Sequence, residues 1–256
     1  YNELLQTLPT IPWLVKHCPP QTEKSIFSQL YWENNHLANE LNAQKCNLLL
    51  NVDASTVCRF SPSVTMSRDM LSYEPGELFR NGFSKTTLRL LIIKHLQNLS
   101  LRSADGVIFL TKYAGRIIQN SCGKLKNVSY IPHGVSSSFR AKTLKKSFEN
   151  NLEDKIIQCL YVSDVAPYKH QWHVVEGMKI LRDMGVNVNL ILTGGGNADG
   201  SSFSKNLLNQ ALSKCDPKRE FISLIGYVNH ERLPELLNKA DLFIFASSCE
   251  NMPNTL

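Results

Sequence analysis

The sequence predicts an α/β protein built from two parallel-sheet domains in tandem. Short apolar runs alternate with helix-period segments along most of the chain. The runs are continuous, which is typical of parallel strands covered on both faces. The alternation lapses in a polar stretch at residues 136–154 and then begins again. We therefore expect a Rossmann-like N-terminal domain at residues 1–143 and a second one at 144–256.

Four apolar runs in the first half predict strands, at residues 47–52, 63–66, 106–110 and 127–131. Two helix-period segments separate them, at residues 85–102 and 111–121. Ser84 is placed to cap the first of these helices. One face of that helix is apolar and is expected to face the core, through Leu88, Ile92, Leu96 and Leu99.

The second half repeats this order. Strands are expected at residues 156–163, 188–193, 221–226 and 242–245, and helices at 171–184, 201–215 and 233–240. The first of these helices should turn four apolar residues inward, namely Trp172, Val175, Met178 and Leu181. The second should do the same with Phe203, Leu207, Ala211 and Leu212.

Composition narrows the class of protein. Hydrophobic residues make up 43% and charged residues 20%, as in globular proteins. The net charge of +6 is spread along the chain, without basic stripes interleaved with aromatics, which disfavours nucleic-acid binding. A solvated basic surface or an anionic ligand would both fit this charge. Seven scattered cysteines without a C-x-x-C pair indicate reduced thiols, neither disulfides nor a zinc site. We expect a cytoplasmic protein.

Ligands of doubly wound sheets bind at the carboxyl ends of the strands, so the loops there hold the candidate residues. The loop "SDVAPYKHQ" at 163–171 brings Lys169 to the start of a helix. A cation beside free helix N–H groups suits a diphosphate, although an ordinary exposed lysine would look the same. In "TGGGNADG", Gly194 and Gly195 would let the backbone approach a phosphate, or form a flexible turn.

Two further loops complete the set. The turn "GYV", with Gly226 and Val228, can offer backbone groups to a nucleobase. The last loop, "ASSCENMPN", holds Glu250, a carboxylate that could accept hydrogen bonds from sugar hydroxyls or be an unremarkable loop acid.

The order of these loops resembles the donor-binding domain of retaining group 1 glycosyltransferases with the GT-B fold. "ADLFIFASSCENMPNTL" is similar to the start of the E-x7-E signature of that family. Upstream, "ADGVIFLTKYAGRII" and "YIPHGVSSSF" resemble segments that close the acceptor domain. The resemblance implies two Rossmann-like domains that face each other across a cleft.

The resemblance also implies roles. Glu250 corresponds to the acid that contacts the donor sugar, and Lys169 to the lysine that binds phosphate. Donor-binding positions follow from the matched turns and glycine loop, at Gly194, Gly195, Gly226, Val228, Asn251, Met252 and Pro253. Arg68 and Asp69 stand where the acceptor domain of the family usually carries a His-Asp pair, and complete the expected catalytic set.

Four departures from the family pattern stand out. Ser163 and Asp164 replace the Gly-Arg of the phosphate clamp, which reverses the sign of a charge. Arg68 is a permanent cation and cannot act as a base at neutral pH. The second Glu of the signature would fall at position 258, past Leu256, and the glycine loop that opens the acceptor domain is absent. We expect a fragment in which both domains are incomplete, with little activity of its own.

The implied function is transfer of a sugar, with retained configuration, from a nucleoside-diphosphate sugar to a hydroxyl acceptor in glycan, cell-envelope or glycolipid synthesis. The resemblance implies no metal and no cofactor, the nucleotide sugar being a co-substrate. Expected partners are this donor, a sugar or lipid-linked acceptor and the inner face of a membrane, with no nucleic acid. Two alternatives stay open: a sugar-nucleotide epimerase of the same fold, and a non-catalytic nucleotide-binding or structural fragment.

Overall fold

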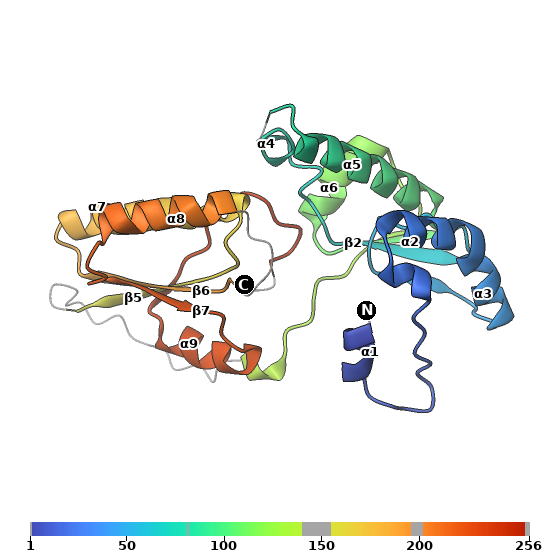
Figure 1. Ribbon diagram of the computed structural model, residues 1–256, viewed down its shortest axis with the longest axis horizontal. Coiled ribbons are helices and arrows are strands. Elements are labelled where there is room, and N and C mark those ends of the chain that lie inside the picture. Colours follow the sequence, from blue (N-terminus) through green and yellow to red (C-terminus); the bar gives the residue numbers. More distant parts are fainter. Residues whose placement is uncertain (1, 81, 140–154, 196–201, 254–256) are drawn as a thin grey trace. The chain divides into compact units, whose positions relative to one another are not determined.

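The computed structural model describes residues 2–80, 82–139, 155–195 and 202–253 (Figure 1). It divides into two compact units, Tyr1–Pro132 and His133–Leu256, each built around one four-stranded parallel sheet. The predicted α/β class with two Rossmann-like parallel sheets is therefore confirmed. The expected boundary between residues 143 and 144 lies within 140–154, outside the described residues.

The N-terminal sheet has the strand order β1-β2-β3-β4, with every neighbouring pair parallel. All four strands overlap the predicted runs: β1 (Leu49–Asn51), β2 (Ser63–Ser67), β3 (Gly106–Phe109) and β4 (Val128–Tyr130). The register pairs Val64 of β2 with Leu50 on one side and Gly106 on the other. Because parallel strands end at the same edge, the loop after β2 lies at the carboxyl edge of the sheet.

Helices α5 (Lys85–Ser103) and α6 (Lys112–Cys122) cover one side of this sheet (Figure 1). Ser84 caps α5 as predicted, since its hydroxyl accepts a hydrogen bond from the Thr87 N–H at 3.2 Å. Helix α6 approaches the sheet closely at Gly115. A Cβ at this position would lie 2.7 Å from the Tyr130 ring and 3.0 Å from the Phe109 ring, so only glycine permits this distance.

The predicted inward face of α5 is wrong. Leu88, Ile92 and Leu99 are 61%, 53% and 49% exposed. The buried side chains are Thr87, Leu90, Gln97, Ser100 and Leu101. Polar contacts account for this orientation: Asn98 accepts a hydrogen bond from the Tyr73 hydroxyl at 3.0 Å and donates one to Ser121 of α6 at 3.1 Å.

Several elements of the N-terminal unit were not predicted. They are short: α1 (Asn2–Thr7), η1 (Pro20–Glu23), α2 (Ile26–Trp32), η2 (Glu33–Leu37), α3 (Ala38–Ala43) and α4 (Pro75–Leu78). Three of them, α2, η2 and α3, follow one another without a gap over residues 26–43, and the middle one is a π-helix, which shifts the apolar period. The other three span no more than two turns, which is too short for an apolar period to stand out in a sequence.

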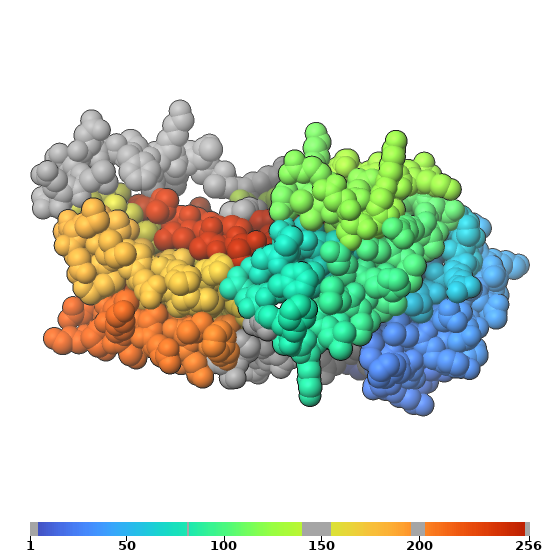
Figure 2. Space-filling model, turned by 90° about the horizontal axis from the view of Figure 1, so that it is seen from above, coloured from blue at the N-terminus to red at the C-terminus, as the bar shows by residue number. Residues whose placement is uncertain are grey.

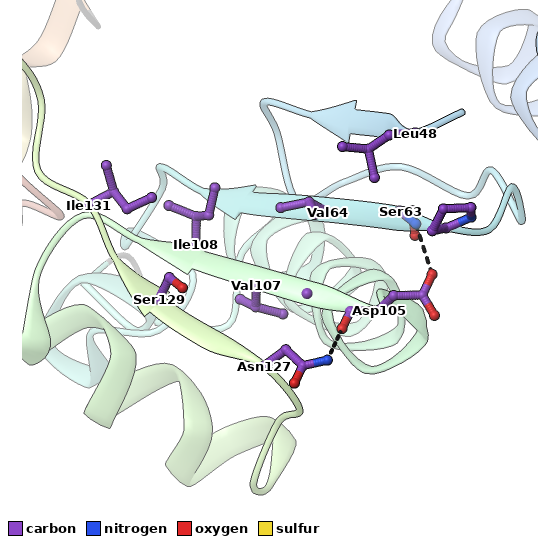
Figure 3. A pocket seen from close by; sticks show the side chains of 11 residues that line it. Leu48, Ser63, Val64, Asp105, Val107, Ile108, Asn127, Ser129 and Ile131 are labelled. Atoms are coloured by element: carbon purple, nitrogen blue, oxygen red, sulfur yellow. Dashed lines mark hydrogen bonds between the residues drawn. The ribbon is translucent and has the colours of Figure 1, made fainter. Parts of the chain in front are cut away.

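One face of the N-terminal sheet is hollowed (Figure 3). Leu48, Val64, Ile108 and Ile131 point to this side and line a hollow of about 390 Å³, whereas Val107 points to the other side. At the amino ends of the strands, Asp105 accepts a hydrogen bond from the Ser63 N–H at 2.8 Å, which lowers the pKa of its carboxyl group. These polar groups fasten strand ends, and the hollow contains none of the expected site residues.

The C-terminal sheet has the order β7-β6-β5-β8, again all parallel. Its strands are β5 (Ile157–Val162), β6 (Val188–Thr193), β7 (Ile222–Gly226) and β8 (Leu242–Phe243). Strand β8 is shorter than predicted and less buried, with Leu242 52% exposed. Only the Ile244 N–H continues its contact with β5, at 2.8 Å from the Leu160 carbonyl oxygen.

Helices α7 (Gln171–Asp183) and α8 (Ser202–Cys215) lie on one side of this sheet, and α9 (Leu233–Lys239) lies on the other (Figure 1). The predicted core residues Trp172, Val175 and Met178 are buried, but Leu181 is 38% exposed. On α8, Ala211 and Leu212 are buried as predicted and Leu207 is half-buried.

Phe203 is a further correction, since it is 63% exposed. It lies in the first turn of α8, where the neighbouring Ser204 is fully buried and takes the inward position. Leu208 supplies the missing apolar contact and belongs to the core cluster. Among the described helices, none is both long enough and apolar enough to cross a lipid bilayer.

Candidate active site

The carboxyl ends of β5, β6 and β7 are tied together by backbone hydrogen bonds. The Ser163 N–H donates to the Thr193 carbonyl at 2.9 Å, and the Gly194 N–H donates to the Gly226 carbonyl at 2.9 Å. The Thr193 hydroxyl donates to the same Gly226 oxygen at 2.8 Å. The glycine loop and the Gly226 turn therefore form one continuous edge.

Gly194 is required by this edge. Its φ is +120°, and a Cβ there would lie 2.2 Å from the carbonyl oxygen of Ser163. No other residue can bring the β6 loop so close to the β5 loop. Gly195 also has a positive φ, of +86°, but a Cβ there would meet nothing within 4 Å.

Asp164, which stands where the family has arginine, is bound to the glycine loop. Its Oδ1 accepts a hydrogen bond from the Gly195 N–H at 3.0 Å, and its carbonyl accepts one from the Gln171 side chain at 2.7 Å. The Gly195 N–H is therefore bound to a carboxylate of the protein and is not available to an anionic ligand. The cation of this loop is Lys169.

Lys169 and Glu250, 81 residues apart in sequence, form an ion pair between Nζ and Oε1. Their side chains are only 15% and 22% exposed. The Ser247 hydroxyl donates a hydrogen bond to the same Oε1 at 2.8 Å. The ammonium group also lies 5.2 Å from the ring centre of Tyr168 and 5.7 Å from that of Phe245, within cation–π range. Lys169 and Glu250 therefore form a cation–anion pair that is largely shielded from solvent.

Tyr161 holds the backbone of Lys169 in place. Its side chain is 1% exposed, and its hydroxyl donates a hydrogen bond to the Lys169 carbonyl at 2.5 Å. Burial, with a smaller effect of the Glu250 charge, raises the pKa of Tyr161 to about 12. The phenol therefore stays protonated and keeps donating to this carbonyl at neutral pH.

The start of α7 is held by the loop that follows β8. His170 has a left-handed backbone, with φ of 54° and ψ of 29°, and its Nε2 lies 2.9 Å from the Ser248 hydroxyl. The Ser248 N–H donates to the Tyr168 carbonyl at 2.9 Å. These contacts fix Lys169 and Glu250 beside the N-terminal end of a 13-residue helix, whose dipole favours anions.

The turn after Glu250 is packed against the beginning of the C-terminal unit. Asn251 is 6% exposed, and Met252 Sδ accepts a hydrogen bond from the His133 N–H at 3.2 Å. Pro253 is half-buried, as is Val228 after the Gly226 turn. The carbonyl of Gly226 already accepts hydrogen bonds from Gly194 and Thr193.

Arg68 and Asp69 lie directly after β2, at the carboxyl edge of the N-terminal sheet, and both are exposed. The Asp69 carboxylate accepts a hydrogen bond from the Leu71 N–H at 3.0 Å and so shapes its own turn. They belong to a different unit from Lys169 and Glu250.

Four residues that shape the site were not predicted from the sequence: Tyr161, Ser247, His170 and Ser248. A tyrosine inside an otherwise apolar strand, two residues before the loop, was the available signal for Tyr161. The adjacent serines before Glu250 were visible as well, but not their partners. Among the described residues, no group of three or more His, Cys, Asp or Glu side chains is placed to hold a metal ion. All seven cysteines are free thiols.

One family model matches the C-terminal part of the chain. The model for glycosyl transferases group 1 matches residues 142–256. No curated protein sequence gives a significant match.

Solved structures give the fold. Sucrose-phosphate synthase from Thermosynechococcus elongatus has a TM-score of 0.67 at 15% identity, over 91% of this chain and 58% of that chain. A TarM mutant from S. aureus, in complex with fondaparinux, alpha-GlcNAc-glycerol and UDP, has a TM-score of 0.55 at 17% identity, over 78% and 35%. HepE from Anabaena, in complex with UDP and glucose, has a TM-score of 0.53 at 20% identity, over 80% and 54%.

The chain spans only 35–58% of the length of these three proteins. At such identities the likeness concerns the fold alone, and both parallel sheets take part in it. Residues 142–256 are therefore similar to glycosyl transferases group 1, and the chain shares the fold of these solved structures.

Proposed function

We propose that the C-terminal unit is the donor site of a glycosyltransferase that transfers a sugar from a nucleoside diphosphate to a hydroxyl acceptor. The observation that carries this proposal is the meeting of Lys169 and Glu250 beside the start of α7. A diphosphate needs a cation and free N–H groups, and a sugar needs hydrogen-bond acceptors. The UDP complexes of TarM and HepE support a nucleotide as the ligand.

In this proposal Lys169 and the N-terminal N–H groups of α7 hold the diphosphate, and Glu250 accepts hydrogen bonds from hydroxyls of the donor sugar. The exposed backbone around Gly226 and Val228 receives the nucleobase. Gly194 and Gly195 shape the edge near the phosphates, and the turn through Asn251, Met252 and Pro253 fixes the position of Glu250. Tyr161 acts as a positioning residue, because it holds the backbone of Lys169.

The proposed reaction breaks one bond and forms one bond at the anomeric carbon of the donor sugar. The bond between the anomeric carbon and the diphosphate oxygen breaks, and the acceptor oxygen bonds to the same face of that carbon. Because the new bond forms on the face that the diphosphate leaves, configuration is retained. The acceptor proton passes to the departing diphosphate, so no separate protein base is needed. Lys169 and the helix dipole stabilise the negative charge that develops on the leaving group, without a metal or a cofactor.

Donor binding competes with the ion pair between Lys169 and Glu250. An incoming diphosphate and the Glu250 carboxylate compete for the same ammonium group, so phosphate binding weakens the hold of Lys169 on Glu250. The carboxylate then becomes available for the sugar. Asp164 cannot replace the missing arginine, because its carboxylate carries the same sign of charge as the diphosphate.

Arg68 and Asp69 are proposed to serve the acceptor, with Arg68 binding an anionic group rather than acting as a base. The proposed acceptors are sugars or lipid-linked sugars in glycan, cell-envelope or glycolipid synthesis. A cytoplasmic location at the inner face of the membrane is part of the proposal, and nucleic acid is not among the proposed partners.

Nucleotide binding by the 256-residue chain tests the proposal. UDP, ADP, GDP and their glucose conjugates are titrated while the melting temperature is followed, because a ligand that binds only the folded protein raises it. At least one should do so. Lys169→Ala should weaken this binding roughly ten- to hundredfold, since a hydrogen bond to a charged group contributes about 1.5–3 kcal/mol. Lys179→Ala, which removes an exposed ion pair with Asp183 on α7, is the matched control.

Glu250→Gln gives a distinctive signature. It should bind the nucleoside diphosphate severalfold more tightly than the wild type, because the amide no longer competes for Lys169. The extra affinity that the sugar adds should fall. A chain that none of the ligands stabilises, or one in which Lys169→Ala and Lys179→Ala behave alike, would contradict the proposed donor site.

A further inference from the structure

His170, the residue directly after Lys169, has a left-handed backbone, with φ of 54° and ψ of 29°. This conformation is costly for a residue with a β-carbon and is adopted most easily by glycine. Three other non-glycine residues of the described chain have a positive φ, and all three lie outside the donor site: Lys45, Asn127 and Arg219. A strained backbone at a functional site suggests that the side chain there has a use.

The imidazole of His170 is fixed at the N-terminal end of α7. Its Nε2 lies 2.9 Å from the Ser248 hydroxyl oxygen. Its ring stacks on that of His173, with centres 5.8 Å apart, and meets the ring of Trp172 edge-on at 5.7 Å. The gold surface of α7 lies beside the red surface of the C-terminal residues in the space-filling view (Figure 2). The ring is therefore held between the first turn of the helix and the loop after β8.

Lys169 and His170 reach the same short stretch of that loop. The Lys169 ammonium group pairs with Glu250, and the His170 imidazole contacts Ser248, two residues earlier. A diphosphate held by Lys169 and the first N–H groups of α7 therefore lies near the imidazole. At such short range the charges of two groups interact with little screening by salt.

The proposed phosphate site is short of positive charge. A diphosphate ester carries two negative charges, whereas the charge of Lys169 is balanced by Glu250 in the empty site. Asp164, at the position of the arginine of the family pattern, adds a further negative charge close by, bound to the Gly195 N–H. A second cation beside Lys169 would offset this deficit.

The surroundings of the imidazole act on its charge in both directions. The elements around it carry five charged or titratable groups, namely Lys169, His173, Glu176, Glu250 and Asp164. Lys169, the stacked ring of His173 and the positive end of α7 oppose a further positive charge. Glu250 is paired with Lys169, and Glu176 with His173. A bound diphosphate would shift this balance toward the imidazolium form.

We infer that His170 is a second, pH-dependent cation of the phosphate site, in place of the missing arginine. On binding of the diphosphate, the imidazole takes up a proton from solvent, and its charge then attracts the diphosphate. Histidine is the side chain that changes its charge near neutral pH. Since the imidazolium form favours binding, affinity is highest at low pH and falls as the pH rises. The inference rests on the donor site proposed above.

Isothermal titration calorimetry of the full chain tests the inference, with UDP-glucose, ADP-glucose and GDP-glucose as probes. Both phosphates of these probes are esterified on both sides, so their charge is constant over the range studied. For a probe that binds, affinity should fall roughly three- to tenfold from about pH 5.5 to about pH 8.5 at constant ionic strength. Titrations in buffers of different ionisation enthalpy should show that protons are taken up on binding.

Three variants separate the charge of His170 from its structural contacts. His170→Asn tolerates the left-handed backbone but carries no charge, so its affinity should be nearly independent of pH, without proton uptake. His170→Arg carries a permanent charge and should bind at about pH 8.5 as tightly as the wild type at about pH 5.5. Arg219, with φ of 57°, shows that arginine is accommodated in this conformation. His173→Asn, the matched control, removes the neighbouring imidazole, which is 64% exposed, and should keep the pH dependence.

Two results would overturn the inference and leave the donor site standing. In the first, Lys169→Ala weakens binding, but wild type and His170→Asn share one pH profile. In the second, His170→Asn weakens binding by the same factor at every pH and His170→Arg does not restore it, which would mean that the imidazole only holds the loop. Loss of the pH dependence in His173→Asn would assign the proton to that ring instead. If none of the three probes binds, the donor site and the inference both fail.

Discussion

The two helix layers of this protein use their apolar residues in opposite ways. In the C-terminal unit, α7 turns Trp172, Val175 and Met178 into the core. In the N-terminal unit, α5 shows an equally regular stripe, yet Leu88 and Ile92 face outward. The difference teaches that periodicity identifies an apolar stripe, whereas the direction of the stripe depends on what the opposite face of the helix can bind.

The polar face of α5 is bound, which explains its orientation. Asn98 joins the Tyr73 hydroxyl to Ser121 of α6, and Thr87 donates to the Gly82 carbonyl at 2.6 Å. Helix α7 has no such polar inner face beyond its first residue, Gln171. Its inner side instead contacts the apolar side chains of β5 and β6.

The largest effect should come from Met178→Ala. Met178 is 2% exposed, so truncation leaves a cavity and should lower the free energy of unfolding by about 2–5 kcal/mol. Urea-induced unfolding, followed by far-UV circular dichroism, measures this change. A loss below about 0.5 kcal/mol would mean that α7 does not pack as described.

Two glycine-to-alanine variants, one in each helix layer, should change the free energy of unfolding by intermediate amounts and in opposite directions. Gly115→Ala in α6 forces a Cβ against Phe109 and Tyr130 and should cost about 1–3 kcal/mol from overpacking, only partly offset by helix propensity. Gly177→Ala in α7 meets nothing within 4 Å and should instead stabilise by about 0.5–1 kcal/mol. The same urea titration measures both changes in the free energy of unfolding. If both variants were stabilised, or both destabilised, the close approach of α6 to the sheet would not require glycine.

The smallest effect should come from Ile92→Ala in α5. This side chain is 53% exposed, so its removal should change the free energy of unfolding by no more than about 0.5 kcal/mol. A loss as large as that of Met178→Ala would place Ile92 in a core.

Much of the fold could be predicted because strands and loops are local features. The run at 188–193 became β6 with both ends as predicted, and Ser84 capped α5. The run at 242–245 was only partly correct, because strand length depends on the neighbour, and the ladder between β8 and β5 ends at Phe243. Helices α1 and α4 escaped prediction because each is too short for a period to show, and α2 and α3 because the π-helix between them shifts the period.

The site was predictable as a set of strand-end loops, but not as a set of contacts. Lys169 and Glu250 could be named from their positions after two strands. Their ion pair, and the attachment of Asp164 to Gly195, depend on β5 standing between β6 and β8. The order of the strands in the sheet cannot be deduced from their order in the sequence.

By itself, the sequence determined that this chain forms parallel strands and helices in two series, since hydrophobic period, capping and glycine are read from neighbouring residues. Only the tertiary structure decided which side of α5 faces solvent and which acid neutralises Lys169. Those outcomes depend on groups far apart in the chain: Tyr73 and Ser121 hold the polar face of α5 inward, and the order of strands in the C-terminal sheet brings Glu250 to Lys169.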